Sequence, residues 1–516
     1  MAETDQKDAP RATANRSTTP GSDAFKEYIS QGWAERPSRA TGPREQAAFA
    51  ADRRARISAL HPTARAVIPA GPAKQRSNDT DYPYRAHSAF AHLTGWGSDT
   101  VPGSVLVLEP RSTDAGEPDG HDAVLYFREA AGRDSDEFYA NPEIGEFWTG
   151  PRPTAADVAA DLALATRGLG DLESVLDSVD ARTILVREAD PSITERVDAQ
   201  RLLLAGPTAA AAADSDADPE AALGELVERD ADLARDLSEL RLVKDAFEIE
   251  QMRLAVAATR QGFDDVIADL PEIVAHPRGE RLVEGSFDRR ARAEGNTVGY
   301  DTIAASGPHA CILHWTRNDG PVLPGDLILI DAGVELESYY TADITRTLPV
   351  SGSFTEVQRR VYEAVREAAD AAFAIVRPGI RFREIHAAAM EVIARRTAEW
   401  GLLPVSAEEA LRPDGGQHRR YMVHGTSHHL GLDVHDCAQA RRDLYLDGVL
   451  EPGMVFTIEP GLYFQPDDLT VPEEYRGIGV RIEDDVLVTA DGCESLSAGI
   501  PRTADDVEAW MARGAR

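Results

Sequence analysis

Cysteine is scarce in this chain, and long hydrophobic runs are missing from it. Its three cysteines, Cys311, Cys437 and Cys493, are an odd number spread over 516 residues. That spacing argues against a disulfide framework and is typical of a reducing cytosol. No apolar run approaches the roughly 20 residues that a membrane span requires. The sequence therefore predicts a cytoplasmic protein with no membrane partner.

Basic residues are also in short supply. Lys and Arg number 54 against 88 Asp and Glu, which gives a formal net charge of -34 at pH 7 and a pI near 4.7. A surface of this sign repels phosphate groups, so it argues against nucleic acid and anionic membranes as partners. Most of the excess charge has an ordinary explanation, because an acidic surface favours solubility.

The length of the chain predicts two domains with tails, since a single core rarely extends so far. Residues 1–44 begin with a polar stretch that lacks the apolar segment of a signal peptide, and we expect a disordered tail there. Residues 45–239 alternate short β-like runs with helical stretches, which favours a compact α/β domain. Within it, the Ala/Asp-rich segment 209–220 is expected to be a surface insertion or linker. Residues 240–505 form the expected second domain, followed by a tail over 506–516.

The second domain is expected to start with a helix, because Asp245-Ala-Phe-Glu248 has the pattern of a capping box. Beyond that helix, amphipathic helices alternate with runs that resemble the strands of β-hairpins. The whole chain is therefore predicted to be α/β (α+β). Three of the apolar runs end in an acidic residue, which places carboxylates at the ends of buried strands: residues 326–331, 454–459 and 479–483.

Four acidic residues stand at the edges of apolar runs. Asp331 and Asp343 would come together if their segments formed a hairpin. A single Asp at a strand end is more often a cap or turn residue, but two flanked by apolar residues favour ligands. Glu459 is followed by a Pro-Gly turn, and Glu483 shares a strand face with Arg481. The alternative for that last pair is a surface ion pair of little value, but its apolar neighbours indicate a buried strand.

Histidines gather in one short segment, residues 424–435, which contains four of the chain's 13. A single histidine on an apolar face is more often a packed core residue. Four carboxylates and one imidazole, however, suit a pair of divalent ions, so at least one of these histidines is expected to be a ligand. The others are placed for proton transfer or carbonyl polarisation. His429 is expected to pack, and His314 could line the same pocket. The residues thus predict a two-metal hydrolase.

These segments give the chain a family resemblance. It resembles aminopeptidase P, the Xaa-Pro aminopeptidase of the pita-bread metallopeptidases, over roughly residues 45–505. The shared motifs are Ile-Asp-Ala-Gly, Asp-Ile-Thr-Arg-Thr, His-Gly-x-Ser-His-x-Leu-Gly-Leu-Asp-Val-His-Asp, Glu-Pro-Gly-Leu-Tyr and Tyr-Arg-Gly-Ile-Gly-x-Arg-Ile-Glu-Asp-Asp. In the first domain the similarity extends to Asp81-Tyr-Pro-Tyr-Arg and Phe90-Ala-His-Leu-Thr-Gly. The resemblance implies an N-terminal aminopeptidase P-type domain before a catalytic domain of the creatinase/aminopeptidase-like, or pita-bread, fold.

Carried over position by position, the resemblance assigns a role to each candidate residue. The implied metal ligands are Asp331, Asp343, His428, Glu459 and Glu483. The implied catalytic residues are Glu459, His424, His435, His314 and Arg481, with His314, Tyr300 and His435 contacting substrate. One departure is visible, because the gap between the two aspartates is one residue longer than the family spacing. The connecting hairpin, residues 334–341, is therefore expected to bulge.

The resemblance also implies a mechanism. Asp343 and Glu483 would bridge two divalent ions, which lower the pKa of a shared water towards ~7. Glu459 would accept its proton, while His424 and His435 contact the scissile carbonyl and the residue beyond it. Proline in the second position has no N–H and a restricted φ, which calls for a dedicated pocket near His314 and Tyr300. Oxygen-rich ligation suits Mn²⁺, with Co²⁺ or Zn²⁺ as alternatives.

Other functions compete with this one. The nearest alternative is a prolidase, which cleaves Xaa-Pro dipeptides with the same ligand set. A methionine aminopeptidase is disfavoured, because it generally lacks so large an N-terminal domain. A non-catalytic pita-bread interaction scaffold would be free to lose ligands, yet all five are present. The predicted partners are peptides with proline in the second position, and a second copy of the chain in a homodimer or homotetramer, as is usual in the family.

Overall fold

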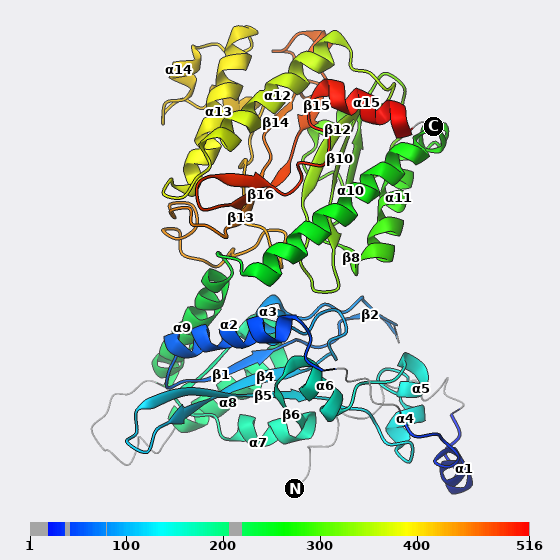
Figure 1. Ribbon diagram of the computed structural model, residues 1–516, viewed down its shortest axis with the longest axis vertical. Coiled ribbons are helices and arrows are strands. Elements are labelled where there is room, and N and C mark those ends of the chain that lie inside the picture. Colours follow the sequence, from blue (N-terminus) through cyan, green and yellow to red (C-terminus); the bar gives the residue numbers. More distant parts are fainter. Residues whose placement is uncertain (1–18, 37–41, 79, 206–218, 515–516) are drawn as a thin grey trace. The chain divides into compact units, whose positions relative to one another are not determined.

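The computed structural model describes residues 19–36, 42–78, 80–205 and 219–514, which are drawn as ribbon in Figure 1. The chain divides into two compact units between Asp236 and Leu237. None of the helices in the described part is both long enough and apolar enough to span a bilayer.

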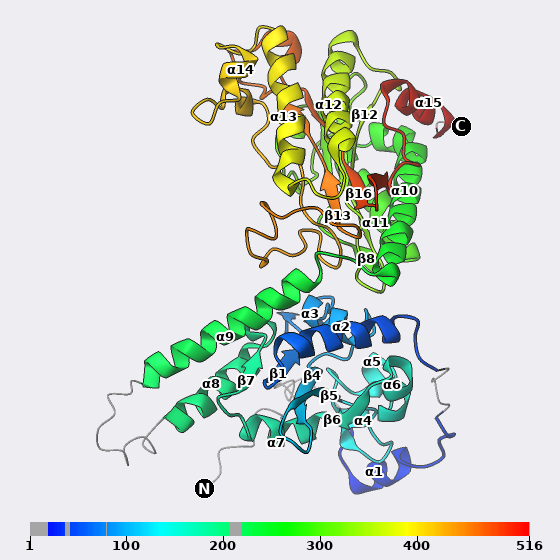
Figure 2. The ribbon, with the colours of Figure 1, turned by 60° about the vertical axis from the view of Figure 1, so that its left-hand side comes forward.

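The first unit is built on one mixed sheet. Its strands are ordered β6-β5-β4-β1-β7, with antiparallel pairs at the centre and a parallel pair at each edge. Helix α2 lies on one side of this sheet and α7 on the other (Figures 1 and 2). Its strands are β1 (Arg65–Pro69), β4 (Val105–Ser112), β5 (Pro118–Phe127), β6 (Ala165–Gly168) and β7 (Thr183–Leu185). Its main helices are α2 (Gln46–Leu60), α3 (Ser88–Thr94), α6 (Ala155–Leu162), α7 (Leu172–Asp177) and α8 (Pro191–Ala205).

Part of the expected N-terminal tail is helical instead. Helix α1 (Asp23–Ile29) lies inside the range 1–44. It is held by the ring of Phe25 against Tyr139 of α4 (Asp136–Ala140), with centroids 5.2 Å apart. The polar composition of the segment hid this aromatic anchor, so the expectation of disorder is wrong for α1. Residues 1–18, and 206–218 of the expected insertion, lie outside the described residues.

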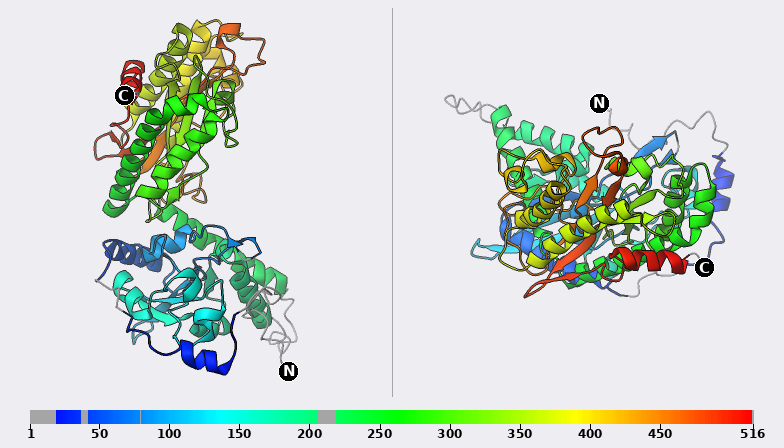
Figure 3. Two further views of the ribbon diagram at one scale, coloured as in Figure 1. Left: turned by 90° about the vertical axis from the view of Figure 1, so that its right-hand side faces the viewer. Right: turned by 90° about the horizontal axis from the view of Figure 1, so that it is seen from above.

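The second unit packs long helices around short antiparallel sheets. Helices α10 and α11 lie side by side, as do α12 and α13 (Figures 2 and 3). The helices are α10 (Ala246–Ala275), α11 (Gly279–Glu294), α12 (Glu356–Ile375), α13 (Phe382–Glu399) and α15 (Ala504–Gly514). The strands are β8 (Thr297–Val298), β9 (Ile303–Ser306), β10 (Leu327–Ala332), β11 (Val334–Glu335), β12 (Ile344–Pro349), β13 (Val455–Ile458), β14 (Gly461–Tyr463), β15 (Gly479–Arg481), β16 (Asp484–Val488) and β17 (Cys493–Ser495).

The first and last helices of this unit, α10 and α15, test two of the predictions made from the sequence. The capping box before α10 is confirmed, because Glu248 N donates to Asp245 Oδ1 at 3.0 Å and Asp245 N donates to Glu248 Oε2 at 2.9 Å. The expected C-terminal tail over 506–516 is wrong for its described part. Those residues belong to α15, where Trp510 is buried and donates through Nε1 to Asp264 at 2.6 Å. The buried indole holds the helix in place.

Two ladders position the acidic residues. β10 pairs antiparallel with β12, in a register that places Asp331 opposite Thr345, so the expected pairing of these two segments is confirmed. Asp343 stands just before β12. The connection leaves this ladder, because β11 pairs with β8 instead. Gly333 allows this path, since a Cβ there would lie 1.7 Å from the carbonyl oxygen of Ala342.

Candidate metal centre

The structure brings all ten candidate site residues to the wall of one cavity of about 450 Å³ in the second unit. Asp331 comes from β10, Glu459 directly follows β13, and Glu483 directly precedes β16. The histidine segment runs beside β13, where Thr457 N donates to His428 O at 2.9 Å. The remaining members are Tyr300, His314, Asp343, His424, His435 and Arg481.

Three donor atoms converge at the centre of this cavity. Asp343, His428 and Glu483 each offer one ligand atom, and these atoms lie within 4.8 Å of one another. His428 Nε2 is 3.3 Å from Asp343 Oδ2 and 3.6 Å from Glu459 Oε1. Its Nδ1 donates to His429 O at 3.1 Å, which orients Nε2 towards the carboxylates.

Asp331 joins the cluster through Tyr300. The Tyr300 hydroxyl lies 2.6 Å from Asp331 Oδ1 and 2.5 Å from Asp343 Oδ1. One hydroxyl proton can serve only one of these oxygens at a time. Two buried carboxylates held this close to one phenol oxygen repel each other, and a cation bound between them would relieve that repulsion.

The pKa shifts of the clustered side chains also indicate a site for cations. Burial, followed by the charges of Asp343 and Glu459, raises the pKa of Glu483 well above its ordinary value. Burial also raises the pKa of Glu459 to about 7, against the lowering effect of His428 and Arg481. The pKa of His428 is raised to about 9, because its hydrogen bond to Asp343 and the charge of Glu459 outweigh burial. The site is thus short of positive charge, and its hard oxygen donors with one imidazole fit two divalent ions.

Arg481 supplies the permanent positive charge at one side of the cluster. It is 4% exposed, which excludes the surface ion pair considered above. Its Nη2 donates to Asp331 Oδ2 at 2.6 Å and its Nε to Thr345 Oγ1 at 3.0 Å. Thr345 Oγ1 in turn donates to Glu483 Oε2 at 2.6 Å. Arg481 therefore braces two carboxylates, one directly and one through a threonine.

His424 is held as a neutral imidazole. Burial and the nearby Arg481 lower its pKa to about 3. Nδ1 donates to Gly425 O at 2.6 Å, which leaves Nε2 to accept from the Tyr463 hydroxyl at 2.8 Å. That hydroxyl also accepts from Arg481 Nη1 at 3.1 Å. Tyr463 is a site residue that the sequence analysis left unassigned, although it ends the Glu-Pro-Gly-Leu-Tyr motif.

The other two histidines line the cavity beside the cluster. The ring of His435 meets that of His428 edge-on, with centroids 4.5 Å apart. His314 lies on a loop tied down by Glu280, a buried carboxylate absent from the sequence analysis. Glu280 accepts from Trp315 Nε1 at 2.9 Å and Gly320 N at 2.6 Å. As expected, His429 packs, stacked on the Phe382 ring at 4.6 Å.

A buried charge cluster anchors the end of the histidine segment. Asp436 Oδ1 accepts from Arg241 Nε at 2.8 Å, and Oδ2 accepts from Lys244 Nζ at 3.2 Å. Burial opposes ionisation of Asp436, but the charges of Arg241 and Lys244 lower its pKa to about 2. Asp436 N also donates to His429 O at 2.9 Å. His435 is therefore attached to a rigid neighbour.

Comparisons with known proteins agree with this geometry. Residues 250–490 match metallopeptidase family M24, and residues 49–184 match the N-terminal domain of aminopeptidase P. Xaa-Pro aminopeptidase 2 of Streptomyces coelicolor is 51% identical over 484 residues, covering 93% of this chain and 94% of the relative. Among solved structures, an aminopeptidase of Pseudomonas aeruginosa superposes with a TM-score of 0.74 at 32% identity, covering 91% of this chain and 98% of its own. A zinc-substituted aminopeptidase P from E. coli in complex with product gives 0.75 at 30% identity, covering 91% and 99%.

Proposed function

This chain belongs to metallopeptidase family M24 and carries the aminopeptidase P N-terminal domain; on that premise we propose that its carboxylate and histidine cluster is the dinuclear metal centre of a Xaa-Pro aminopeptidase. The protein is a metal-dependent hydrolase of the N-terminal Xaa-Pro bond of peptides. One observation carries the assignment of the centre. Donor atoms of Asp343, His428 and Glu483 meet within 4.8 Å; Glu459 lies 3.6 Å from His428, and the Tyr300 hydroxyl links Asp331 to Asp343.

We assign Asp331, Asp343, His428, Glu459 and Glu483 as the metal ligands. When two divalent ions are bound, they supply a water of lowered pKa as the nucleophile. Four oxygen ligands to one nitrogen favour Mn²⁺, with Co²⁺ and Zn²⁺ as alternatives.

Side chains of the protein accept the proton of the attacking water and bind the scissile carbonyl. Glu459 accepts the proton of the attacking water, because its carboxylate lies at the cluster, with Oε1 3.6 Å from His428 Nε2. His435 donates a hydrogen bond to the scissile carbonyl and stabilises the charge that develops on it. His424 contacts the residue beyond the scissile bond, and through Tyr463 it keeps Arg481 in place.

The proline pocket is proposed to lie beside His314 and Tyr300. The Tyr300 hydroxyl is engaged by Asp331 and Asp343, so Tyr300 offers the substrate its ring. The apolar Ile303 and Leu313 line the same cavity and suit the pyrrolidine ring of proline.

The decisive experiment replaces a ligand and the base. Glu459→Ala and His428→Ala are each expected to abolish hydrolysis of a Xaa-Pro-Xaa tripeptide while the circular dichroism spectrum is unchanged. His276→Ala, which alters an exposed histidine at the end of α10, is the matched control and keeps full activity. Near-normal rates in either site variant would contradict the assignment.

Two simpler measurements separate the competing functions. A prolidase cleaves the Xaa-Pro dipeptide and leaves the tripeptide largely intact, whereas the proposed aminopeptidase cleaves the tripeptide. A non-catalytic scaffold would carry no metal in elemental analysis of the purified protein. We further propose a cytoplasmic homodimer or homotetramer with domains over 45–239 and 240–505, which light scattering and limited proteolysis test.

A further inference from the structure

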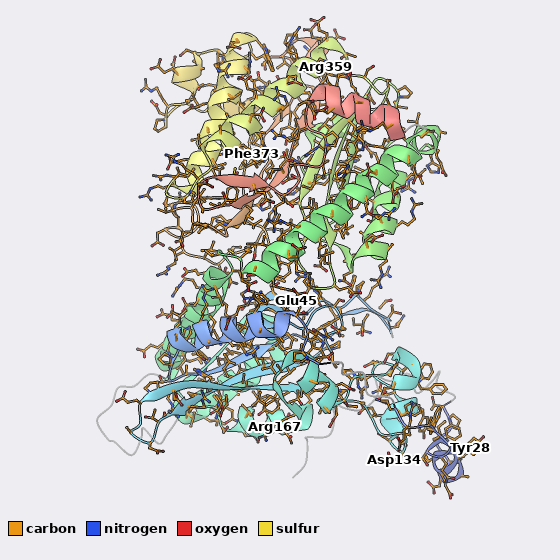
Figure 4. All side chains as sticks on the ribbon, viewed as in Figure 1. Tyr28, Glu45, Asp134, Arg167, Arg359 and Phe373 are labelled. Atoms are coloured by element: carbon orange, nitrogen blue, oxygen red, sulfur yellow. The ribbon has the colours of Figure 1, made fainter. Side chains whose placement is uncertain are left out.

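A second cavity, of about 580 Å³, lies in the first unit and shares no residue with the metal centre. Helix α2 forms one wall, the β4–β5 hairpin another, and the turn from α6 to β6 closes the end. Figure 4 labels Glu45, the residue just before this helix. The volume is in the range of small-molecule pockets, which is 300–1,000 Å³.

Small apolar side chains make most of the lining. Ala51, Ala55 and Ala59 stand four residues apart and therefore share one face of α2. Leu108, Pro118, Ala123, Ala163, Leu164 and Ala165 complete the apolar surface. No Asp or Glu lines the cavity, although acidic residues outnumber basic ones in the chain by 88 to 54.

Arg54 brings an uncompensated charge to this cavity. Its side chain is buried, with the residue 8% exposed, and Nη1 donates to Leu93 O at 2.7 Å. Within the described part of the chain it has no carboxylate partner, and burial alone lowers its pKa to about 10. Three other buried arginines have a carboxylate partner: Arg201 pairs with Asp230, Arg346 with Asp484, and Arg481 with Asp331. A buried cation without a counter-ion is costly unless a ligand supplies one.

The unpaired N–H donors of Arg54 lie along one edge of its guanidinium group. Its Nε and Nη2 have no hydrogen-bond partner among the described residues, and Arg54 is one of the residues that line the cavity. These two nitrogens make the side of the guanidinium that binds a carboxylate through two parallel hydrogen bonds.

Other polar groups of the lining are already paired. His121 Nε2 donates to Ala64 O at 2.7 Å, and the Ser58 hydroxyl donates to His121 Nδ1 at 2.7 Å. Arg111 donates to the Asp119 carbonyl through Nε and Nη2, and its Nη1 lies 3.5 Å from Asp122 Oδ1. Arg54 is thus the anchor that remains open.

We propose that this cavity binds a small organic carboxylate with a short aliphatic body, held by the guanidinium edge of Arg54. The alanine-lined wall accommodates the aliphatic part, and the absence of acidic lining residues removes repulsion. Two sources share this chemistry: amino acids, and carboxylic acids without an amine.

The test uses the full chain and isothermal titration calorimetry with 4-methylpentanoate, its neutral amide, leucine and inorganic phosphate. We expect 4-methylpentanoate to bind and the amide not to bind. Arg54→Gln should weaken binding by about tenfold or more, because the two charge-assisted hydrogen bonds are lost. Arg56→Gln makes the same charge change at an exposed position of α2 and is expected to leave the affinity within about twofold.

A second variant keeps the anchor buried and intact. Ala55→Glu places a carboxylate at an exposed position of the lining and is expected to abolish binding, while tripeptide hydrolysis stays unchanged as a check of folding. Leucine binding as tightly as 4-methylpentanoate supports an amino-acid ligand, and weaker leucine binding supports a carboxylate without an amine. The proposal is overturned if 4-methylpentanoate fails to bind at up to ~10 mM, if phosphate alone binds, or if both cavity variants bind like the parent protein.

Discussion

Replacing Asp436 by Asn should destabilise the second unit through the two cations it leaves behind. The side chain of Lys244 is fully buried and that of Asp436 is 1% exposed. Without the carboxylate, the Lys244 ammonium has no hydrogen-bonded carboxylate among the described residues and keeps the carbonyl oxygen of Arg241, at 2.6 Å. Arg241 keeps a charged partner in this variant, because Asp433 Oδ2 lies 3.4 Å from its Nη2. The variant therefore leaves the fully buried positive charge of Lys244 without its carboxylate partner.

The expected loss of stability can be estimated from this one buried, unpaired charge. Removing one partner of a buried pair costs about 3–5 kcal/mol, most of it the penalty of the charge that stays. For a unit the size of Leu237–Arg516, the unfolding entropy is about 0.6 kcal/mol per degree. The melting transition of this unit should therefore fall by about 5–8 °C.

A double-mutant cycle followed by scanning calorimetry tests the reasoning. Lys244→Met removes the stranded ammonium, so the double variant should recover at least about 2 kcal/mol of the loss caused by Asp436→Asn alone. Asp433→Asn, at a half-exposed partner of Arg241, should cost under about 1 kcal/mol and serves as the control. Strict additivity of the two substitutions, or a loss below about 1 kcal/mol for Asp436→Asn, would refute the account.

Three further outcomes are expected. Chelation of the metal should lower the melting temperature of the second unit by about 7 °C for each ion present at about 1,000 times its Kd; a thermogram unchanged by chelator would count against the dinuclear centre. Gly333→Ala should abolish activity in a peptidase assay, because its Cβ would lie 1.7 Å from Ala342 O, on the segment between the ligands Asp331 and Asp343. The control is Gly285→Ala on α11, whose Cβ would meet nothing within 4 Å and which should keep full activity. An active Gly333→Ala enzyme would contradict the stated path of the backbone. The pKa of Asp436 is about 2 when folded, below its ordinary value, so its stabilisation is present above about pH 4 and is lost as the pH falls towards 2. The difference in free energy of unfolding between the parent and Asp436→Asn, measured by urea titration, should shrink over that window rather than stay constant.

Local patterns were sufficient to predict the acidic ends of the strands. Asp331, Glu459 and Glu483 each close an apolar run, and the structure places all three at one cavity. The choice of His428 over His424 as ligand came from the family resemblance, because spacing alone left both open. The structure supports that choice through His428 Nε2, which faces Asp343 and Glu459.

The supporting residues could not be predicted because their partners are remote in sequence. Tyr463 reaches His424 across 39 positions, and Glu280 reaches Trp315 across 35. Asp485, which accepts from Asp343 N at 3.3 Å across 142 positions, is another such case. Composition also misled the prediction at both ends, where the half-buried Phe25 and the buried Trp510 help to hold helices in polar segments.

The contact between Arg481 and Asp331 spans 150 positions, and it joins β10 to β15, which lies near the end of the second unit. A growing chain cannot make this contact until its last strands have left the ribosome. Because long-range pairing of this kind forms late, unfinished chains are inert as peptidases. We expect hydrolysis to begin only when the second unit has been synthesised through Glu483, the last of the proposed metal ligands in the chain.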